Sequence, residues 1–177
     1  MKKVIIKAKL SSRDGFEQKL SDIDLDFSQI YWQHDRVYVP RGYKRSMNLP
    51  RLVMRTEMLS VNEAPSYSLI LKRHIEDSGV DVVETTPVTD YAATANIILQ
   101  LGFKPVAEVS RRRQDLIMGE GTEIYLDEID GRPGEYYAKM ESVLNAGDSV
   151  EEAREDLRKT FQTLDETNIV ESAYFEL

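Results

Sequence analysis

The chain has 177 residues, of which 41% are hydrophobic and 31% charged, and its net charge of -8 argues against a protein that coats nucleic acid nonspecifically. It contains no cysteine, which excludes disulfide bonds and thiolate zinc sites, and His34 and His74 alone are too few for an imidazole metal site. With no membrane-spanning apolar run and no signal-peptide pattern at the start, we expect a cytoplasmic protein with a single domain over residues 1–177.

Residues 2–10 alternate in polarity, as a half-buried strand does. The apolar face carries Val4, Ile6, Ala8 and Leu10, and the opposite face carries Lys3, Ile5, Lys7 and Lys9. Lysines in this pattern also protect solvent-facing edge strands from aggregation, so that interpretation stays open beside a functional one.

A short helix and two strands follow. Ser11 or Ser12 offers the helix cap, and the predicted apolar stripe of the helix is Phe16, Leu20 and Ile23. Residues 30–39 and 51–58 interleave apolar and polar residues and are predicted strands. On the second of these, the face opposite Leu52 and Met54 carries Arg51, Val53 and Arg55.

The middle of the chain adds two strands and a helix. In residues 66–73, Lys72 lies on the face opposite Leu69 and Leu71, and residues 74–87 are predicted to form a turn and a strand. Residues 88–101 fit a helix that begins at the cap Thr89 and ends before Gly102, with Ala92, Ala95, Ile98 and Leu99 as its buried stripe.

Three strand-like runs between residues 106 and 143 bring many charged side chains together. Their turns are predicted at Glu120-Gly121 and at Arg132-Pro133-Gly134. The first run carries Arg111, Arg112 and Arg113; the faces opposite the apolar residues carry Glu123, Tyr125 and Asp127 in the second run and Tyr137, Lys139 and Glu141 in the third. Such a sheet is either a solvated surface or part of a barrel with a charged interior.

The remaining residues contribute one more helix and no separate catalytic motif. Ser149 begins a capping-box-like SVEE, the helix continues to about residue 165, and residues 169–177 are a predicted short strand or turn. His34 and Asp35 look like an acid-base pair, but adjacent residues on a strand point to opposite faces, so we expect structural roles for them.

Short motifs along the chain occur in an order that belongs to one known family. They are IKAKL, the strand of Arg55, Lys72 after SLIL, LGFKPVAEVSRRR, EIYLDEIDGRPG, YAKMES and the terminal AYFEL. Together they make nearly the whole chain similar to the CYTH domain of the triphosphate tunnel metalloenzymes, especially class IV adenylyl cyclases and thiamine triphosphatases. The resemblance implies an α+β fold, in which an antiparallel eight-stranded β-barrel has about three helices packed outside.

In that family, basic side chains in the barrel lumen grip a triphosphate and acidic side chains hold divalent cations. Carried over by position, the phosphate-binding residues are Lys7, Lys9, Arg55, Lys72, Arg111 and Arg113, and the metal-binding residues are Asp127 and Glu141, with Glu123 a weaker candidate. The implied partner is a triphosphate-bearing small molecule or polyphosphate, and the implied assembly is a homodimer. No cofactor is certain, since Mg²⁺ or Mn²⁺ is implied only for an active enzyme.

Three of the four carboxylates in the family's paired-glutamate motifs are absent here. Lys3 and Ile5 stand where the first pair is expected, and the late pair becomes Lys139 and Glu141. Val53 also replaces one of two arginines that usually share its strand.

An alternative alignment places Ala138 and Met140 at the late glutamate pair. We disfavour it, because this shift of one residue would turn both apolar side chains into the lumen.

Lysine in place of glutamate changes the expected chemistry. Divalent cations need oxygen ligands and an ammonium repels them, but an ammonium can bind phosphate oxygens directly. We therefore add Lys3 and Lys139 to the phosphate-binding set and expect a triphosphate, nucleotide or polyphosphate binder with reduced or lost metal-dependent catalysis, a pseudoenzyme. The alternative is a barrel without a ligand, in which the basic side chains form internal salt bridges with Asp127, Glu123 and Glu141.

Two other functions stay open. One is an active metal-dependent triphosphatase or class IV adenylyl cyclase-like enzyme, and the other is an interaction protein that uses the surface of the scaffold. The phosphate-binding residues contact only phosphate, so the sequence predicts the phosphate part of the ligand and not its organic group.

Overall fold

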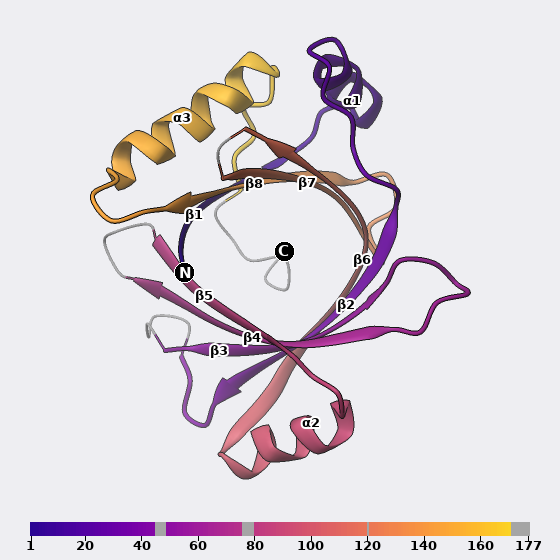
Figure 1. The fold of residues 1–177 in the computed structure, drawn as a ribbon, viewed down its shortest axis with the longest axis vertical. Coiled ribbons are helices and arrows are strands. Elements are labelled where there is room, and N and C mark those ends of the chain that lie inside the picture. The colour runs from indigo at the N-terminus through magenta and orange to yellow at the C-terminus, as the bar shows by residue number, and fades with distance from the viewer. Residues whose placement is uncertain (45–48, 76–79, 120, 171–177) are drawn as a thin grey trace.

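Eight antiparallel strands close into a barrel in the computed structural model, which describes residues 1–44, 49–75, 80–119 and 121–170 (Figure 1). Around the ring the strands follow the order β1-β5-β4-β3-β2-β6-β7-β8. Their bounds are Lys2–Lys9 (β1), Tyr31–Pro40 (β2), Arg51–Met58 (β3), Ser66–Ile75 (β4), Val80–Pro87 (β5), Phe103–Met118 (β6), Thr122–Ile129 (β7) and Tyr136–Leu144 (β8). Closure pairs β1 with both β5 and β8, which confirms the predicted barrel.

Helices pack against the outside of this barrel (Figure 1). They are α1 (Arg13–Ser21), α2 (Tyr91–Gln100) and α3 (Val150–Thr163). The predicted caps Ser12 and Ser149 accept hydrogen bonds from the third residue after each of them, at 3.1 and 3.3 Å. Among the described residues, no helix combines the length and apolar composition that a membrane span requires.

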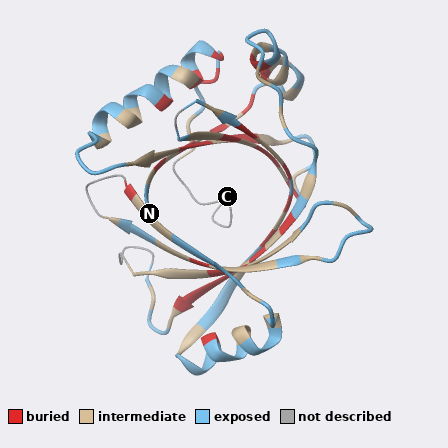
Figure 2. Cartoon of the chain, viewed as in Figure 1, coloured by how far each residue is buried: buried red, intermediate tan, exposed pale blue. Residues whose placement is uncertain are grey.

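The apolar core lies between the helices and the outer strand faces. Phe16 of α1 and Phe161 of α3 are buried in one cluster with β1, β7 and β8, whereas Ile98 of α2 packs with Tyr38 and Met54 against another part of the ring. In Figure 2 the helices are largely exposed on the sides that face away from the strands. The barrel is therefore stabilised from outside by conventional apolar burial.

Details of the predicted helices differ in the structure. Asp90, not Thr89, caps α2: its carboxylate accepts a 2.9 Å hydrogen bond from the Ala93 backbone, and a negative charge is favoured at a helix N-terminus. Ile23 and Leu99 were predicted to be buried, but 58% and 41% of their surfaces are exposed. Ile23 lies beyond the end of α1 and therefore cannot extend its buried stripe.

Two predicted features lie partly outside the described residues. They are the Glu120-Gly121 turn, because Glu120 is not described, and the last strand, because residues 171–177 are not described. Within the described part, Ile169 forms an antiparallel bridge with Ala8 beside β1.

Candidate functional site

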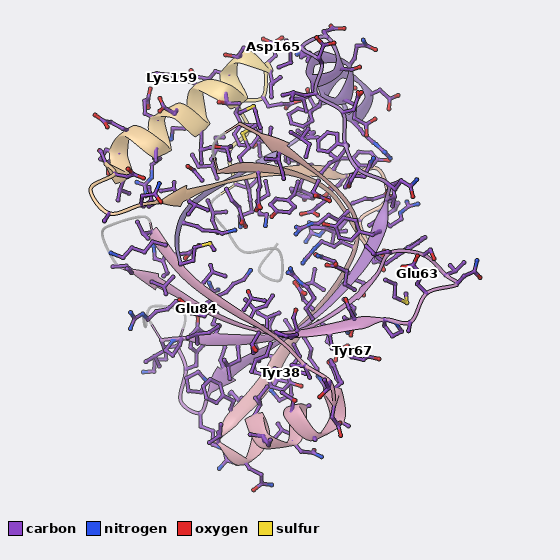
Figure 3. All side chains as sticks on the ribbon, viewed as in Figure 1. Tyr38, Glu63, Tyr67, Glu84, Lys159 and Asp165 are labelled. Atoms are coloured by element: carbon purple, nitrogen blue, oxygen red, sulfur yellow. The ribbon has the colours of Figure 1, made fainter. Side chains whose placement is uncertain are left out.

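Strand alternation turns the charged residues of β8 into the barrel. Ala138 and Met140 are fully buried in the core cluster beneath α1 and α3, so Lys139 and Glu141 face the interior, toward which many side chains project in Figure 3. The predicted faces of this strand are confirmed, because Ala138 and Met140 point away from the lumen and into the outer core.

Asp35 on β2 is held by arginines from both neighbouring strands. Its carboxylate accepts hydrogen bonds of 2.7 and 2.9 Å from Arg55 on β3, and another from Arg111 on β6. Arg111 also donates a 3.1 Å hydrogen bond to Gln33. Burial alone would raise the pKa of Asp35, but Arg111 and Arg55 hold that pKa well below its usual value. The carboxylate is therefore ionised and positions both guanidinium groups.

Asp127 on β7 continues this arrangement around the ring. It is fully buried, and its two oxygens accept hydrogen bonds of 2.5 and 2.6 Å from Arg113 on β6. Arg111 lies 3.8 Å from the same carboxylate and links it to the group around Asp35. Burial would raise the pKa of Asp127, but Arg113 and Arg111 lower it to about 2.

Glu141 on β8 lies between Lys3 of β1 and Lys139 of its own strand. Its oxygens are 2.7 Å from Lys3 Nζ and 2.5 Å from Lys139 Nζ. Glu123 accepts a hydrogen bond from the Tyr125 hydroxyl and lies 3.4 Å from Lys3 Nζ. Lys3 and Lys139 are thus ion-paired with interior carboxylates.

Lys139 is additionally surrounded by other cations and an aromatic ring. Its Nζ lies 4.0 Å from the centre of the Tyr125 ring, which the Arg113 guanidinium also approaches to 4.5 Å. Burial, assisted by the charges of Arg113 and Lys72, lowers the pKa of Lys139 to about 7 despite the opposing effect of Glu141. The ammonium of Lys139 therefore loses its proton more readily than that of an ordinary lysine.

Lys72 on β4 differs from the other interior cations, because it makes no hydrogen bond or ion pair within the part of the chain that the structure describes. Burial, followed by the nearby charge of Arg55, lowers its pKa to about 8. It therefore supplies positive charge that no carboxylate of the described residues directly neutralises.

Most of the predicted phosphate-binding residues come together inside the barrel. We use the name charged belt for Lys3, Lys7, Asp35, Arg55, Lys72, Arg111, Arg113, Glu123, Asp127, Lys139 and Glu141, whose cations outnumber its carboxylates. Lys7 belongs to it because it lies directly opposite Lys139 in the β1–β8 ladder. Lys9 does not: it forms a 2.8 Å ion pair with Glu135, and 38% of its side chain is exposed.

Sequence reasoning missed the role of Asp35. The expectation that His34 and Asp35 point to opposite faces agrees with their contacts, since His34 bonds to Ser110 while Asp35 bonds to interior arginines. Only the alternation Gln33, Asp35, Val37 along β2 could have indicated an interior carboxylate.

Part of the interior is apolar. Val37, Val53 and Ile70, from three adjacent strands, pack together and are at most 5% exposed. Val53 stands where the family resemblance called for an arginine, and it is directly paired with both other members of this cluster. The barrel interior is therefore apolar on this side.

The carboxylates of the charged belt do not fit a divalent cation as they stand. Asp127 forms an ion pair with Arg113, and Glu141 forms ion pairs with Lys3 and Lys139, so each carboxylate already has close cationic partners. Within the described ranges, no group of three or more histidine, aspartate or glutamate side chains could hold a metal ion. Metal binding by Asp127, Glu141 and Glu123 remains a prediction that requires these ion pairs to open.

No family model matches the sequence, and no curated protein matches it closely enough to count as a relative. Solved structures do match over almost the whole chain. The PH1819 protein of Pyrococcus horikoshii aligns with a TM-score of 0.83 and 21% identity, covering 98% of this chain and 96% of its own.

Two further matches carry functional descriptions of their own. A candidate adenylate cyclase from Vibrio parahaemolyticus aligns with a TM-score of 0.80 and 19% identity, covering 98% of this chain and 95% of its own. The HpAC1 protein of Hippeastrum, described as having a dominant triphosphatase activity, aligns with a TM-score of 0.62 and 16% identity, covering 99% and 94%. Together with the closed ring of eight antiparallel strands, these matches show that the chain has the CYTH, or triphosphate tunnel, fold.

Proposed function

We propose that the charged belt binds a triphosphate, a nucleotide or a polyphosphate without a divalent cation, and that metal-dependent turnover is reduced or lost. The observation that carries the proposal is Lys72, an interior ammonium with no hydrogen bond or ion pair among the described residues. Concentrated positive charge away from bulk water is costly, and a polyanion would offset that cost.

The ion pairs within the charged belt support ligand binding without a divalent metal ion. Lys3 and Lys139 neutralise Glu141, and Arg113 neutralises Asp127. These carboxylates therefore orient lysine and arginine side chains instead of binding divalent metal ions. Guanidinium groups held in this way present remaining N–H donors in fixed directions, which suits phosphate oxygens. The likeness to the triphosphatase HpAC1 agrees with the ligand class.

Isothermal titration of tripolyphosphate, ATP and thiamine triphosphate tests the proposal, first with excess magnesium and then with a chelator. The same samples are assayed for phosphate, pyrophosphate and cyclic nucleotide. We expect affinity to persist in chelator and products to be absent.

Two outcomes would contradict this proposal. Loss of all binding in chelator would show that a metal bridges ligand and protein. Magnesium- or manganese-dependent product formation would favour the enzyme, and would mean that Asp127, Glu141 and Glu123 open their ion pairs to hold the ion. In that case Asp127→Ala or Glu141→Ala should abolish turnover.

A further inference from the structure

A pocket on the outer side of the barrel lies where helix α2 packs on strands β2 and β6. Its volume is about 290 Å³, and it is lined by Arg36, Tyr38, Tyr91, Ala92, Ala95, Asn96, Leu99 and Pro105. Sites for small molecules begin at about 300 Å³. The pocket therefore has room for a compact ligand of one or two rings.

The walls of this outer pocket are mostly apolar and are fixed by packing. Tyr38, labelled beside α2 in Figure 3, is 1% exposed and packs with Ile98 in the outer core. Tyr91 is held against Tyr67, with ring centres 5.3 Å apart. The small side chain of Ala95 leaves space that a larger residue on α2 would fill.

A buried donor without a hydrogen bond belongs to the lining of the outer pocket. Arg36 Nε lies 3.1 Å from Glu108 Oε1, but the pair lacks hydrogen-bond geometry, and no other group in the described part of the chain accepts a hydrogen bond from this nitrogen. A buried donor without an acceptor is destabilising. An acceptor on a ligand in the pocket would remove that cost.

The charges around the outer pocket favour an uncharged ligand. Glu108 already balances the positive charge of Arg36, and α2 carries no charged side chain between Tyr91 and Gln100. A carboxylate or phosphate would bring a second negative charge close to Glu108, whereas a carbonyl oxygen can accept from Arg36 Nε without one. Asn96 adds an amide that both donates and accepts hydrogen bonds.

We propose that the outer pocket binds an uncharged aromatic amide. The amide oxygen of the ligand accepts a hydrogen bond from Arg36 Nε, its amide nitrogen donates to the Asn96 side chain, and its ring packs against Tyr38 and Tyr91. The charged belt takes no part in this recognition, so the inference is independent of the proposed anion site.

Two probes of the same shape and different charge test the proposal on the unmodified protein. 2-Naphthamide and 2-naphthoate are titrated separately into ¹⁵N-labelled protein, and amide shifts are followed by NMR. We expect 2-naphthamide to bind saturably with a dissociation constant of about 1 mM or lower, as for a fragment of this size. The shifts should centre on Ala92, Ala95 and Asn96, and 2-naphthoate should bind at least about tenfold more weakly.

Three results would overturn the proposal. They are the absence of saturable binding, shifts that centre away from α2, and binding of 2-naphthoate as tight as that of 2-naphthamide. Excess tripolyphosphate should leave the affinity for 2-naphthamide unchanged. Competition between the two would place the amide in the barrel lumen and would also contradict the assignment.

Filling the outer pocket from α2 should block the amide. Ala95→Phe places a ring in the space that the ligand needs and should abolish detectable binding of 2-naphthamide. Ala93→Phe, the matched control, adds the same ring at an exposed position of α2 that does not line the pocket, and should leave the affinity unchanged. Equal affinities in the two variants would show that the amide binds elsewhere.

Removing the buried donor should weaken binding without removing charge. Arg36→Lys keeps a cation near Glu108 but has no Nε donor, so 2-naphthamide should bind about tenfold more weakly. Arg112→Lys makes the same change at an outer-face arginine that pairs with Glu128 and does not line the pocket, and should have no effect. Unchanged affinity in Arg36→Lys would contradict the role of Nε.

Discussion

The outer and inner faces of the same strands are stabilised in opposite ways. On β8, Met140 points outward into an apolar core and Glu141, its neighbour, points inward between two lysines; both are buried. Burying Met140 is favourable by itself, whereas burying Glu141 costs desolvation that only its partners offset. Apolar burial on the outer face therefore stabilises the barrel. A bound anion can change the free energy of the charged inner face.

The largest expected effect comes from breaking an inner pair. Asp127→Ala leaves Arg113 buried without its bidentate partner and should lower the free energy of unfolding by about 3–5 kcal/mol. Urea denaturation measures the change. The matched control is Glu128→Ala, which removes a half-exposed ion pair with Arg112 on the outer face and should cost at most about 1 kcal/mol. Equal losses in the two variants would remove the distinction between the faces.

A substitution on the outer face should affect stability alone. Met140→Ala removes a fully buried side chain and should lower the free energy of unfolding by about 2–5 kcal/mol. The affinity of the folded variant for tripolyphosphate, measured by calorimetry, should equal that of the parent protein. A large loss of affinity would mean that the outer core also sets the geometry of the charged belt.

Removal of Lys72, an inner cation without an ion pair in the described part of the chain, should change ligand affinity and leave stability unharmed. Lys72→Ala removes a charge that makes no ion pair in the described residues, so tripolyphosphate should bind roughly ten- to a hundredfold more weakly, about 1.5–3 kcal/mol. Thermal stability without ligand should stay the same or rise. Arg73→Ala removes an exposed positive charge from the next position of β4 and should leave affinity unchanged. Equal weakening in both variants would indicate only a general effect of net charge.

The smallest expected effect is an exchange of protons on binding. Lys72 and Lys139 have pKa values lowered to about 8 and about 7, and a bound polyanion favours their charged forms. Binding should therefore take up protons at pH 8, and affinity should fall as the pH rises through this range. Calorimetry in two buffers of different ionisation enthalpy measures the uptake. The arginine of Lys72→Arg does not titrate near pH 8, so the proton uptake on binding should fall by up to about half a proton in this variant. Equal proton uptake in the variant and the parent protein would show that the anion binds away from Lys72.

The alternation of polarity allowed much of the fold and of the charged belt to be predicted. A two-residue period separates the face of Val4, Ile6 and Ala8 from that of Lys3 and Lys7 without any knowledge of the neighbouring strands. The helix start at Ser149 was equally readable, because capping depends on residues within one turn. Local rules failed by one residue at Asp90, where two cap residues stand side by side.

Pairing between distant strands could not be predicted in this way. Asp35 meets Arg55 and Arg111 because β2 lies between β3 and β6 in the ring, and Val53 meets Ile70 through the β3–β4 register. The sequence by itself determined which side chains face inward, since that follows from the geometry of a single strand. Only the tertiary structure decided which carboxylate neutralises which cation and left Lys72 without an ion pair among the described residues, since those contacts depend on ring closure and register between strands far apart in sequence.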